Sequence, residues 1–366
     1  MGNYFGALVQ WCQLAKDRSF PTKSPDKGGN LHTVIISCEK PIYSIVDVHA
    51  YTSPRCQFGA PLYEQILSTT ASLLALGLNN QNCILTRQSD ILEHNYLDNV
   101  FHNFVSTQRL AHMTQFKEKI ASLSSKYDQH KTQMDFAETF GKNSKSVPNG
   151  LLTYPILQAA DILLYRANFV PVGEDQVQHL ELARDVARNF NHKTGSSLFP
   201  EPKVLLNRSS HARRLKSLRD PTKKMSKSEP DKKSFIEITD EPEVIVEKFK
   251  KAVTDSISKV YYEPETRPGI SNLMRIHHLT TGSSFDDIQQ ELENVESAKY
   301  KLMLADIVIE HLKPVRLEYN RIRSDRQFLE SVLSAGRREA QPMAQETIQR
   351  VRHLLGSIRL SEDSAQ

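Results

Sequence analysis

Several features are missing from this chain of 366 residues, and each absence argues against one class of protein. It contains no apolar run close to the roughly 18 residues that a membrane-spanning helix needs. Its four cysteines, Cys12, Cys38, Cys56 and Cys83, show neither CxxC spacing nor a histidine at zinc-site intervals. The sequence therefore predicts no spanning helix and no zinc site, and it indicates free thiols in a reducing compartment.

The first residues also lack the pattern of a targeting segment. They are neither a signal peptide nor an Arg- and Ser-rich transit peptide. Tyr4, Leu8, Trp11 and Ala15 instead recur at helical spacing, so we expect an amphipathic helix that begins almost at once, with Asn3 as its N-cap.

The charge is mild overall but unevenly distributed. The net charge of +4 does not by itself indicate a nucleic-acid ligand. Between Lys203 and Lys233, however, eleven lysines and arginines face only three acidic residues. This block predicts a polyanionic ligand nearby.

Inside that block lies the run Lys224-Met225-Ser226-Lys227-Ser228, with a proline on either side at Pro221 and Pro230. Prolines and serines disfavour both a helix and a central strand, so we expect a mobile loop. Two lysines three positions apart could act as point charges on a polyphosphate. The alternative is an ordinary solvated basic loop.

Apolar runs alternate with helical patterns in the first two thirds of the chain. Expected strands are 41–49, 83–86 and 169–172, and expected helices cover about 62–77, 92–123, 151–165 and a stretch after 176. Alternation of this kind predicts an α/β fold with a parallel, Rossmann-like sheet. After a short expected strand at 235–238 the chain has a helical pattern to its end, so we expect two domains, 1–234 and 235–366.

The expected helix 151–165 is apolar almost all the way round, with Pro155 in its first turn, so it should be buried. Asp161 would then need a hydrogen-bond donor, from the protein or from a ligand. It could equally lie on a thin solvent-facing strip. Behind the last expected strand, Gly173-Glu174-Asp175-Gln176 either occupies the ligand crevice of an open sheet or caps the next helix.

The chain resembles the class I aminoacyl-tRNA synthetases, and among them the bacterial and mitochondrial tryptophanyl branch. KMSKS marks the class, and LLTYP, DILLY and VPVGEDQ together mark the branch. Further segments carry the likeness in the same order: GNYFGAL, YSIVDVHA, RLAHMTQFKEK, KAVTDS and PGISNL.

The resemblance implies a tryptophan–tRNA ligase that uses ATP with Mg²⁺. Tryptophan's carboxylate would attack the α-phosphate of ATP, and the acyl group would then pass to the terminal ribose of tRNA(Trp). Residues 1–234 would form the Rossmann-like catalytic domain, ending in the KMSKS loop, and 235–366 the α-helical anticodon-binding domain. The family also implies a homodimer.

Site residues carry over by position. The catalytic lysines would be Lys224, Lys227 and Lys119. ATP contacts would come from Gly2, Asn3, Gly173, Asp175, Lys224, Met225, Ser226, Lys227 and Ser228. The tryptophan pocket would comprise His49, Tyr154, Asp161, Ile162, Val170, Val172 and Gln176, in which Asp161 would accept the indole N–H and Gln176 would lie near the ammonium group. No residue is assigned as a metal ligand.

One departure from the family stands at the start. Members begin with a strand and a HIGH-like signature, of which only the final Gly2-Asn3-Tyr4 remains here. We therefore expect an N-terminally truncated chain, and the alternative function is a catalytically impaired RNA-binding relative. A tyrosine-specific synthetase is a third possibility. The Lys/Ser-rich stretch 20–40 favours a mitochondrial matrix enzyme, with a cytoplasmic one as the alternative.

Overall fold

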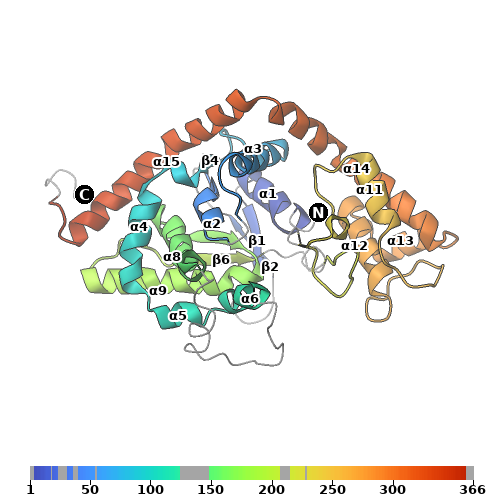
Figure 1. The fold of residues 1–366 in the computed structure, drawn as a ribbon, viewed down its shortest axis with the longest axis horizontal. Coiled ribbons are helices and arrows are strands. Elements are labelled where there is room, and N and C mark those ends of the chain that lie inside the picture. The colour runs from blue at the N-terminus through green and yellow to red at the C-terminus, as the bar shows by residue number, and fades with distance from the viewer. Residues whose placement is uncertain are drawn as a thin grey trace. The chain divides into compact units, whose positions relative to one another are not determined.

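The computed structural model describes residues 4–17, 19–23, 31–35, 40–53, 56–123, 148–206, 215–226 and 229–359. The chain forms two compact units, each assembled from separated stretches. We call 39–70, 79–206 and 330–366 the sheet unit, and 1–38, 71–78 and 207–329 the helical unit. Figure 1 labels their elements, and each unit is described by itself.

The sheet unit contains two parallel strand pairs. β3 (Ile42–Ile45) pairs with β4 (Ile84–Arg87), and β5 (Phe169–Val172) pairs with β6 (Lys203–Leu206). Among the described residues no ladder joins the two pairs, and β6 was not predicted. Parallel strands joined through helices confirm the α/β class.

Helices make up most of what the structure describes of the rest of this unit. They are α2 (Asp47–Tyr51), α4 (Glu93–Phe101), α5 (Thr107–Ala111), α6 (Thr114–Leu123), α8 (Asn149–Leu164) and α9 (Val177–Thr194), with the short 3₁₀ turns η2 (Gln88–Asp90), η3 (His102–Phe104) and η5 (Glu174–Gln176). The single helical region expected at 92–123 is thus several short helices. Two further helices, α3 (Ala60–Ala75) and α15 (Arg326–Leu354), each contribute residues to both units.

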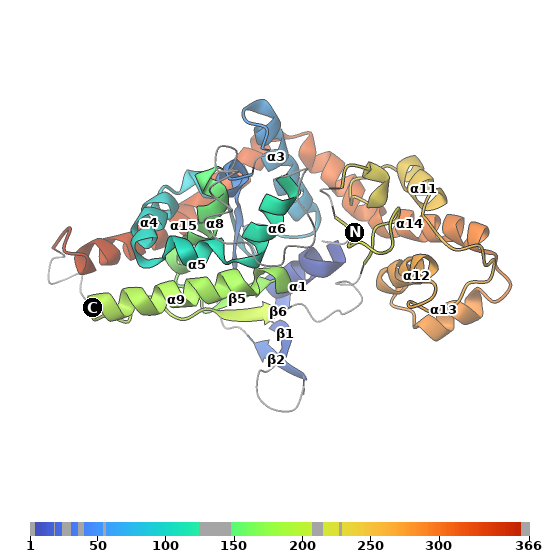
Figure 2. The ribbon, with the colours of Figure 1, turned by 60° about the horizontal axis from the view of Figure 1, so that its bottom comes forward.

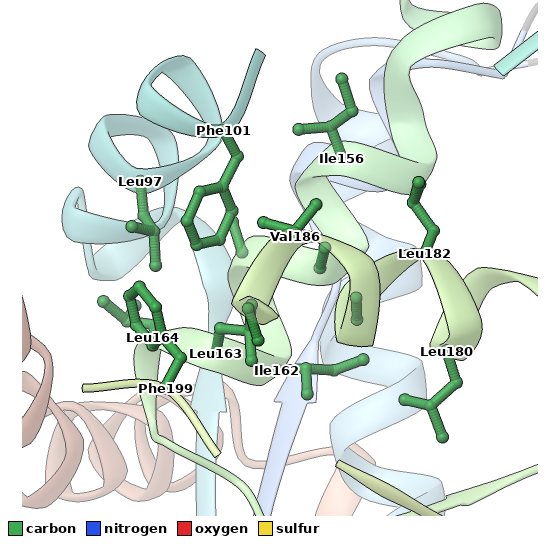
Figure 3. Packing of buried hydrophobic residues seen from close by; sticks show 14 of the residues in the cluster. Leu97, Phe101, Ile156, Ile162, Leu163, Leu164, Leu180, Leu182, Val186 and Phe199 are labelled. Atoms are coloured by element: carbon green, nitrogen blue, oxygen red, sulfur yellow. The ribbon is translucent and has the colours of Figure 1, made fainter. Parts of the chain in front are cut away.

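The core of the sheet unit lies between α4, α8 and α9. In Figure 3, Ile156, Ile162 and Leu163 of α8 lie among side chains of α9 such as Val186, with Phe101 of α4 close by. Figure 2 shows β5 and β6 running beside α9. Burial of this apolar surface is the main force that holds α8 in place.

α8 confirms the buried helix expected at 151–165, and its sequence explains why. Eleven of its side chains are buried, including Leu151, Ala159 and Ala160. The helix begins at Asn149, however, so Pro155 lies inside it and not in its first turn. The expected position of Pro155 was wrong because polar Asn149 and Gly150 gave no apolar signal for the start of the helix.

Gly336 of α15 explains how that helix packs so closely on β4. A Cβ atom at Gly336 would lie 1.9 Å from the carbonyl oxygen of Leu85, far inside a permissible contact. Only glycine therefore allows the helix backbone to approach the strand at this point.

The helical unit begins with η1 (Tyr4–Leu8) and α1 (Val9–Asp17), which confirms the expected helix at the start of the chain. β1 (Ser19–Lys23) and β2 (Leu31–Ile35) then form an antiparallel hairpin that was not predicted. The described part of the unit continues with the short turn η6 (Lys232–Ser234) and the helices α11 (Pro242–Lys250), α12 (Pro268–Thr281), α13 (Phe285–Glu291) and α14 (Ser297–Arg323).

The side chains of this unit share one apolar core, which includes Phe249, Met274, Tyr300 and Leu304. Helical structure after residue 242 confirms the expected helical pattern of the last third. The strand expected at 235–238 was wrong: these residues form no strand, and Phe235 and Ile236 are buried in the helical core instead. Among the described residues, no helix is both long and apolar enough to cross a membrane.

Candidate functional site

A polar stripe runs along the otherwise apolar helix α8. Tyr154, Gln158, Asp161 and Tyr165 follow one another at i, i+4, i+7 and i+11, so they lie on one face of the helix and its C-terminal cap. Each of the four makes a side-chain hydrogen bond to another element of the sheet unit. The stripe is therefore the place where polar groups gather inside the apolar core.

Asp161 is the charged centre of this stripe. Its Oδ1 accepts hydrogen bonds from Nε2 of Gln88 at 2.8 Å and from Nδ1 of His94 at 2.6 Å. Its Oδ2 accepts a bond from Nε2 of His49 at 2.9 Å. The carboxylate is thus satisfied partly from within the protein, which the sequence alone left open.

Three donors stabilise the charged form of this carboxyl. Burial opposes ionisation, but the hydrogen bonds from His49 and His94 outweigh it and hold the pKa of Asp161 below its usual range. The Asp161 side chain remains 15% exposed. An ionised carboxylate offers about four acceptor positions, so one position on Oδ2 remains for a ligand.

Two of these donors lie after the C-terminal ends of two paired strands. His49 follows β3 and Gln88 follows β4, and the carboxyl ends of parallel strands meet at one edge. Asp47 ties the two ends together, because its carboxylate accepts hydrogen bonds from the backbone N–H and the hydroxyl of Ser89 at 3.0 and 2.5 Å. The backbone N–H of His49 donates to Oε1 of Gln88 at 3.3 Å, which leaves the amide N–H₂ of Gln88 directed at Asp161.

His94 and Tyr165 are site residues that the sequence did not reveal. His94 of α4 is 1% exposed and lies between Asp161 and the hydroxyl of Tyr165, which is 2.9 Å from its Nε2. Burial and the nearby charge of Asp161 raise the pKa of Tyr165. A histidine on an amphipathic helix gives no signal of its partners, so only the fold identifies this pair.

A second polar cluster lies at the other end of the stripe, around Tyr154. The Tyr154 hydroxyl donates to Oε1 of Gln115 at 3.0 Å and lies 3.2 Å from Nε2 of His179. Burial, followed by the charge of Lys119, lowers the pKa of His179 to about 4, so this histidine is neutral at pH 7. Its Nδ1 then donates to Oε1 of Gln176 at 2.8 Å.

Lys119 is held against this second cluster. Its Nζ lies 3.8 Å from the centre of the Tyr154 ring, a cation–π contact. Partial burial lowers the pKa of Lys119. The Tyr154 ring meets His49 edge-on at 6.5 Å between centroids, so it lies between the Asp161 cluster and this lysine.

The turn 173–176 joins the same cluster at the end of β5. Nε2 of Gln176 donates to the Asp175 carboxylate at 2.8 Å, and Nε2 of Gln158 donates to Oε1 of Gln176 at 3.3 Å. Gly173 is exposed, and a Cβ there would lie 2.7 Å from Oδ1 of Asp175. The turn therefore leads into α9 and shares hydrogen bonds with the polar stripe of α8.

Three apolar residues complete the sequence-based set in this unit. Ile162 is buried in the core, whereas Val170 and Val172 on β5 are only half-buried. β5 has no fully buried residue, which is unusual for a parallel strand and leaves its side chains partly accessible.

The lysine segment, residues 215–226, belongs to the helical unit. The segment forms a hydrogen-bonded hairpin. The N–H of Met225 donates to Leu215 O at 3.1 Å, and Lys216 faces Lys224 across an antiparallel bridge. Met225 is 7% exposed and packs in the helical core, whereas Lys224 is exposed. Ser226 follows as a half-buried residue.

The backbone of this segment is held by α12. The side chain of Asn272, which is 1% exposed, accepts a hydrogen bond from Lys216 N–H at 2.8 Å and donates to Lys216 O at 2.9 Å. A second contact comes from Val253, whose N–H donates to Leu218 O at 2.8 Å. Gly2, Asn3, Lys227 and Ser228 lie outside the described residues.

Comparison with known proteins defines the class. The family model for class I tRNA synthetases of the W and Y type matches residues 30–313, which is most of the chain. The chain therefore belongs to the class I tRNA synthetases, and it is a ligase of the aminoacyl-tRNA synthetase type. The family drawn from the sequence motifs is confirmed.

Similar proteins narrow the class to one branch. A tryptophan–tRNA ligase of Wolinella succinogenes is 37% identical over 359 residues, which cover 98% of this chain and 95% of the relative. A mitochondrial tryptophan–tRNA ligase of Dictyostelium discoideum is 34% identical over 97% of this chain and 92% of its own. The structure also resembles Campylobacter jejuni tryptophanyl-tRNA synthetase complexed with ADP and tryptophan, with a TM-score of 0.73, 26% identity and coverage of 97% and 95%.

Proposed function

We propose that this chain is a tryptophan–tRNA ligase, which activates tryptophan with ATP and transfers it to tRNA(Trp). One observation carries the choice of amino acid: the held carboxylate of Asp161 keeps one acceptor position, and an indole has one donor and no acceptor. The names of the relatives from Wolinella and Dictyostelium support the same substrate.

The tryptophan pocket is proposed to lie along the polar stripe. Asp161 would accept the indole N–H, and Gln176 would face the substrate's ammonium group. The remaining walls would be His49, Tyr154, Ile162, Val170 and Val172. The half-buried β5 side chains and the accessible part of Asp161 support this placement, because both leave surface that a ligand can contact.

ATP is proposed to bind next to the turn 173–176. Gly173 allows a close approach of the ligand to the backbone, and Lys119 would contact the phosphates. By the family resemblance, further nucleotide contacts would come from Lys224, Met225, Ser226, Lys227 and Ser228 and from Gly2 and Asn3. The ADP in the Campylobacter structure supports a nucleotide in this family.

Mg²⁺ is proposed to arrive with ATP as part of the substrate. The described residues contain no group of three or more His, Cys, Asp or Glu that could hold a metal ion. Mg²⁺ usually keeps several waters and binds through substrate phosphates with few carboxylates. The lysines would then share the neutralisation of charge with the ion.

The remaining assignments follow the family. Residues 1–234 would form the catalytic domain and 235–366 the anticodon-binding domain, in a homodimer. The mitochondrial relative favours the mitochondrial matrix, with the cytoplasm as the alternative.

Tryptophan-dependent exchange of pyrophosphate into ATP tests the proposal. Asp161→Asn should raise the KM for tryptophan by about 10- to 100-fold, since a hydrogen bond to a charged group contributes about 1.5–3 kcal/mol. Lys227→Ala should lower kcat with little change in that KM. Exchange driven equally well by tyrosine, or no exchange with any amino acid, would contradict the proposal.

A further inference from the structure

We propose that His94 and Tyr165 are positioning residues that determine specificity for the indole N–H by fixing Asp161 as a pure acceptor. The inference deepens the proposed function and rests on it, because it takes Asp161 as the group that receives the indole. Neither residue is placed in contact with the substrate.

The geometry is a chain of three side chains in the sheet unit. The Tyr165 hydroxyl lies 2.9 Å from Nε2 of His94, and Nδ1 of the same ring lies 2.6 Å from Oδ1 of Asp161. The two rings meet edge-on, with centroids 5.5 Å apart. His94 is 1% exposed, so the protein and not solvent decides which hydrogen bonds it makes.

These contacts determine where the protons lie. An ionised carboxylate can only accept, so Nδ1 of His94 must carry the hydrogen that faces Asp161. In a neutral ring Nε2 then has a lone pair, and the Tyr165 hydroxyl is the group that donates to it. Without that hydroxyl Nε2 would lose its partner in a buried position, and the ring would be held less firmly in the orientation that directs Nδ1–H at the carboxylate.

The other two partners of Asp161, Gln88 and His49, also direct a donor at it. Gln88 is held by the backbone N–H of His49 so that its amide N–H₂ faces Asp161, and His49 donates to Oδ2. All three partners therefore donate into Asp161. The site presents an acceptor for the ligand, because each of the three partners directs a hydrogen at the carboxylate.

A carboxylate that can only accept hydrogen bonds distinguishes indole from phenol. Indole nitrogen needs an acceptor only, whereas a phenol oxygen also has lone pairs that lose their water partners when buried. This difference matters in a family that includes both tryptophan and tyrosine enzymes. We therefore assign to His94 and Tyr165 a part in the choice between the two amino acids.

The end of α8 holds the Tyr165 hydroxyl at this distance. The N–H of Ala167 donates to Ile162 O at 3.3 Å and the N–H of Arg166 donates to Leu163 O at 2.9 Å, which closes the helix with Tyr165 as its cap. Arg166 adopts the left-handed region at φ 48°, where glycine is the usual residue. The helix end therefore keeps a costly conformation that fixes where Tyr165 lies.

The test measures binding of two ligands to the full 366-residue chain by equilibrium dialysis. One is tryptophan, and the other is 3-benzothienylalanine, in which sulfur replaces the ring N–H at nearly the same shape. Wild type should prefer tryptophan by about 10- to 100-fold. The variants are Tyr165→Phe, which removes only the hydroxyl, His94→Leu, and His94→Asn, whose amide can still donate near the Nδ1 position.

Tyr165→Phe should lower the preference for tryptophan by about 5-fold and leave the affinity for the sulfur analogue unchanged. His94→Leu should remove most of the preference, and His94→Asn should restore part of it. Equal losses for both ligands would show a role in pocket shape only and would overturn the inference, as would an unchanged preference in Tyr165→Phe and His94→Leu. Failure of the wild-type chain to bind tryptophan would instead overturn the proposed function itself, and the inference with it.

Discussion

The Asp161 cluster and the lysine segment both carry charge, but they are built in opposite ways. Around Asp161, buried side chains from η2 and α4 and a half-buried one from α2 hold another side chain. In the lysine segment, buried Asn272 and the N–H of Val253 hold the backbone, while Lys224 itself is exposed. The first arrangement fixes the position of the charged group itself. The second fixes the backbone of the segment and leaves the lysine side chain exposed.

This difference matches what the two charges would have to do. A buried acceptor that selects one N–H gains from being fixed before the ligand arrives, because less ordering is then required on binding. Lysines that follow a phosphate group through a reaction need freedom at their tips and a firm base. The comparison therefore predicts that packing changes near the first site alter substrate affinity, whereas those near the second alter rate.

Substitutions at two glycines should give the largest effects, and they test this contrast. Gly336 packs on Leu85, three residues before Gln88, and a Cβ at Gly269 would lie 2.4 Å from Val253 O, next to the N–H that holds the lysine segment. Overpacking of this kind costs about 1–3 kcal/mol, and we expect Gly336→Ala to lie at the upper end and Gly269→Ala below it. Unfolding in urea measures both losses.

The same variants separate affinity from rate. Gly336→Ala should weaken tryptophan binding, and Gly269→Ala should lower the rate of pyrophosphate exchange while leaving tryptophan affinity within about twofold. Ser334→Ala, at an exposed position of the same helix as Gly336, is the control that should change neither. Weaker tryptophan binding in Gly269→Ala but not in Gly336→Ala would reverse the comparison.

Asn272 offers a second, smaller test at the base of the lysine segment. Asn272→Ala removes two hydrogen bonds to Lys216 and should lower the free energy of unfolding by about 2 kcal/mol. Asn272→Asp keeps an acceptor for Lys216 N–H but loses the donor to Lys216 O, so its exchange rate should lie between those of wild type and Asn272→Ala. An unchanged exchange rate in Asn272→Ala would show that the anchor has no role in the reaction.

Sequence patterns predicted the parts of the molecule that depend on local periodicity. α8 was predicted because its apolar residues surround the helix, and Asp161 was noticed because a carboxylate is out of place there. Its partners were not predicted, since His94 and Gln88 lie 67 and 73 residues away and nothing in their own elements indicates their direction. β6 was missed because the four residues Lys203–Leu206 run directly into the basic block.

The lysine segment shows the same limit of prediction from sequence patterns. Its prolines and serines correctly indicated that it is neither a helix nor a central strand, but they hid the hairpin that Met225 and Leu215 form. Asn272, which holds that hairpin, lies 56 residues from Lys216 and was read only as part of a family motif. Long-range hydrogen bonds of this kind need the fold before they can be found.

The smallest effect concerns His179, a neutral side chain in the cluster around Tyr154. Burial first, and then the charge of Lys119, lower the pKa of His179 to about 4 in the folded chain, below the usual value near 6.5. The unfolded chain therefore binds more protons between these values, so this residue should favour folding above pH 6.5 and lose that contribution as the pH falls toward 4. Between pH 7 and 5.5 the free energy of unfolding should fall by about 1 kcal/mol.

Urea unfolding at several pH values should show this slope in wild type and a shallower one in His179→Gln, which cannot titrate. Parallel slopes in the two proteins would mean that His179 is not held neutral, and that the Tyr154 cluster is charged like the Asp161 cluster.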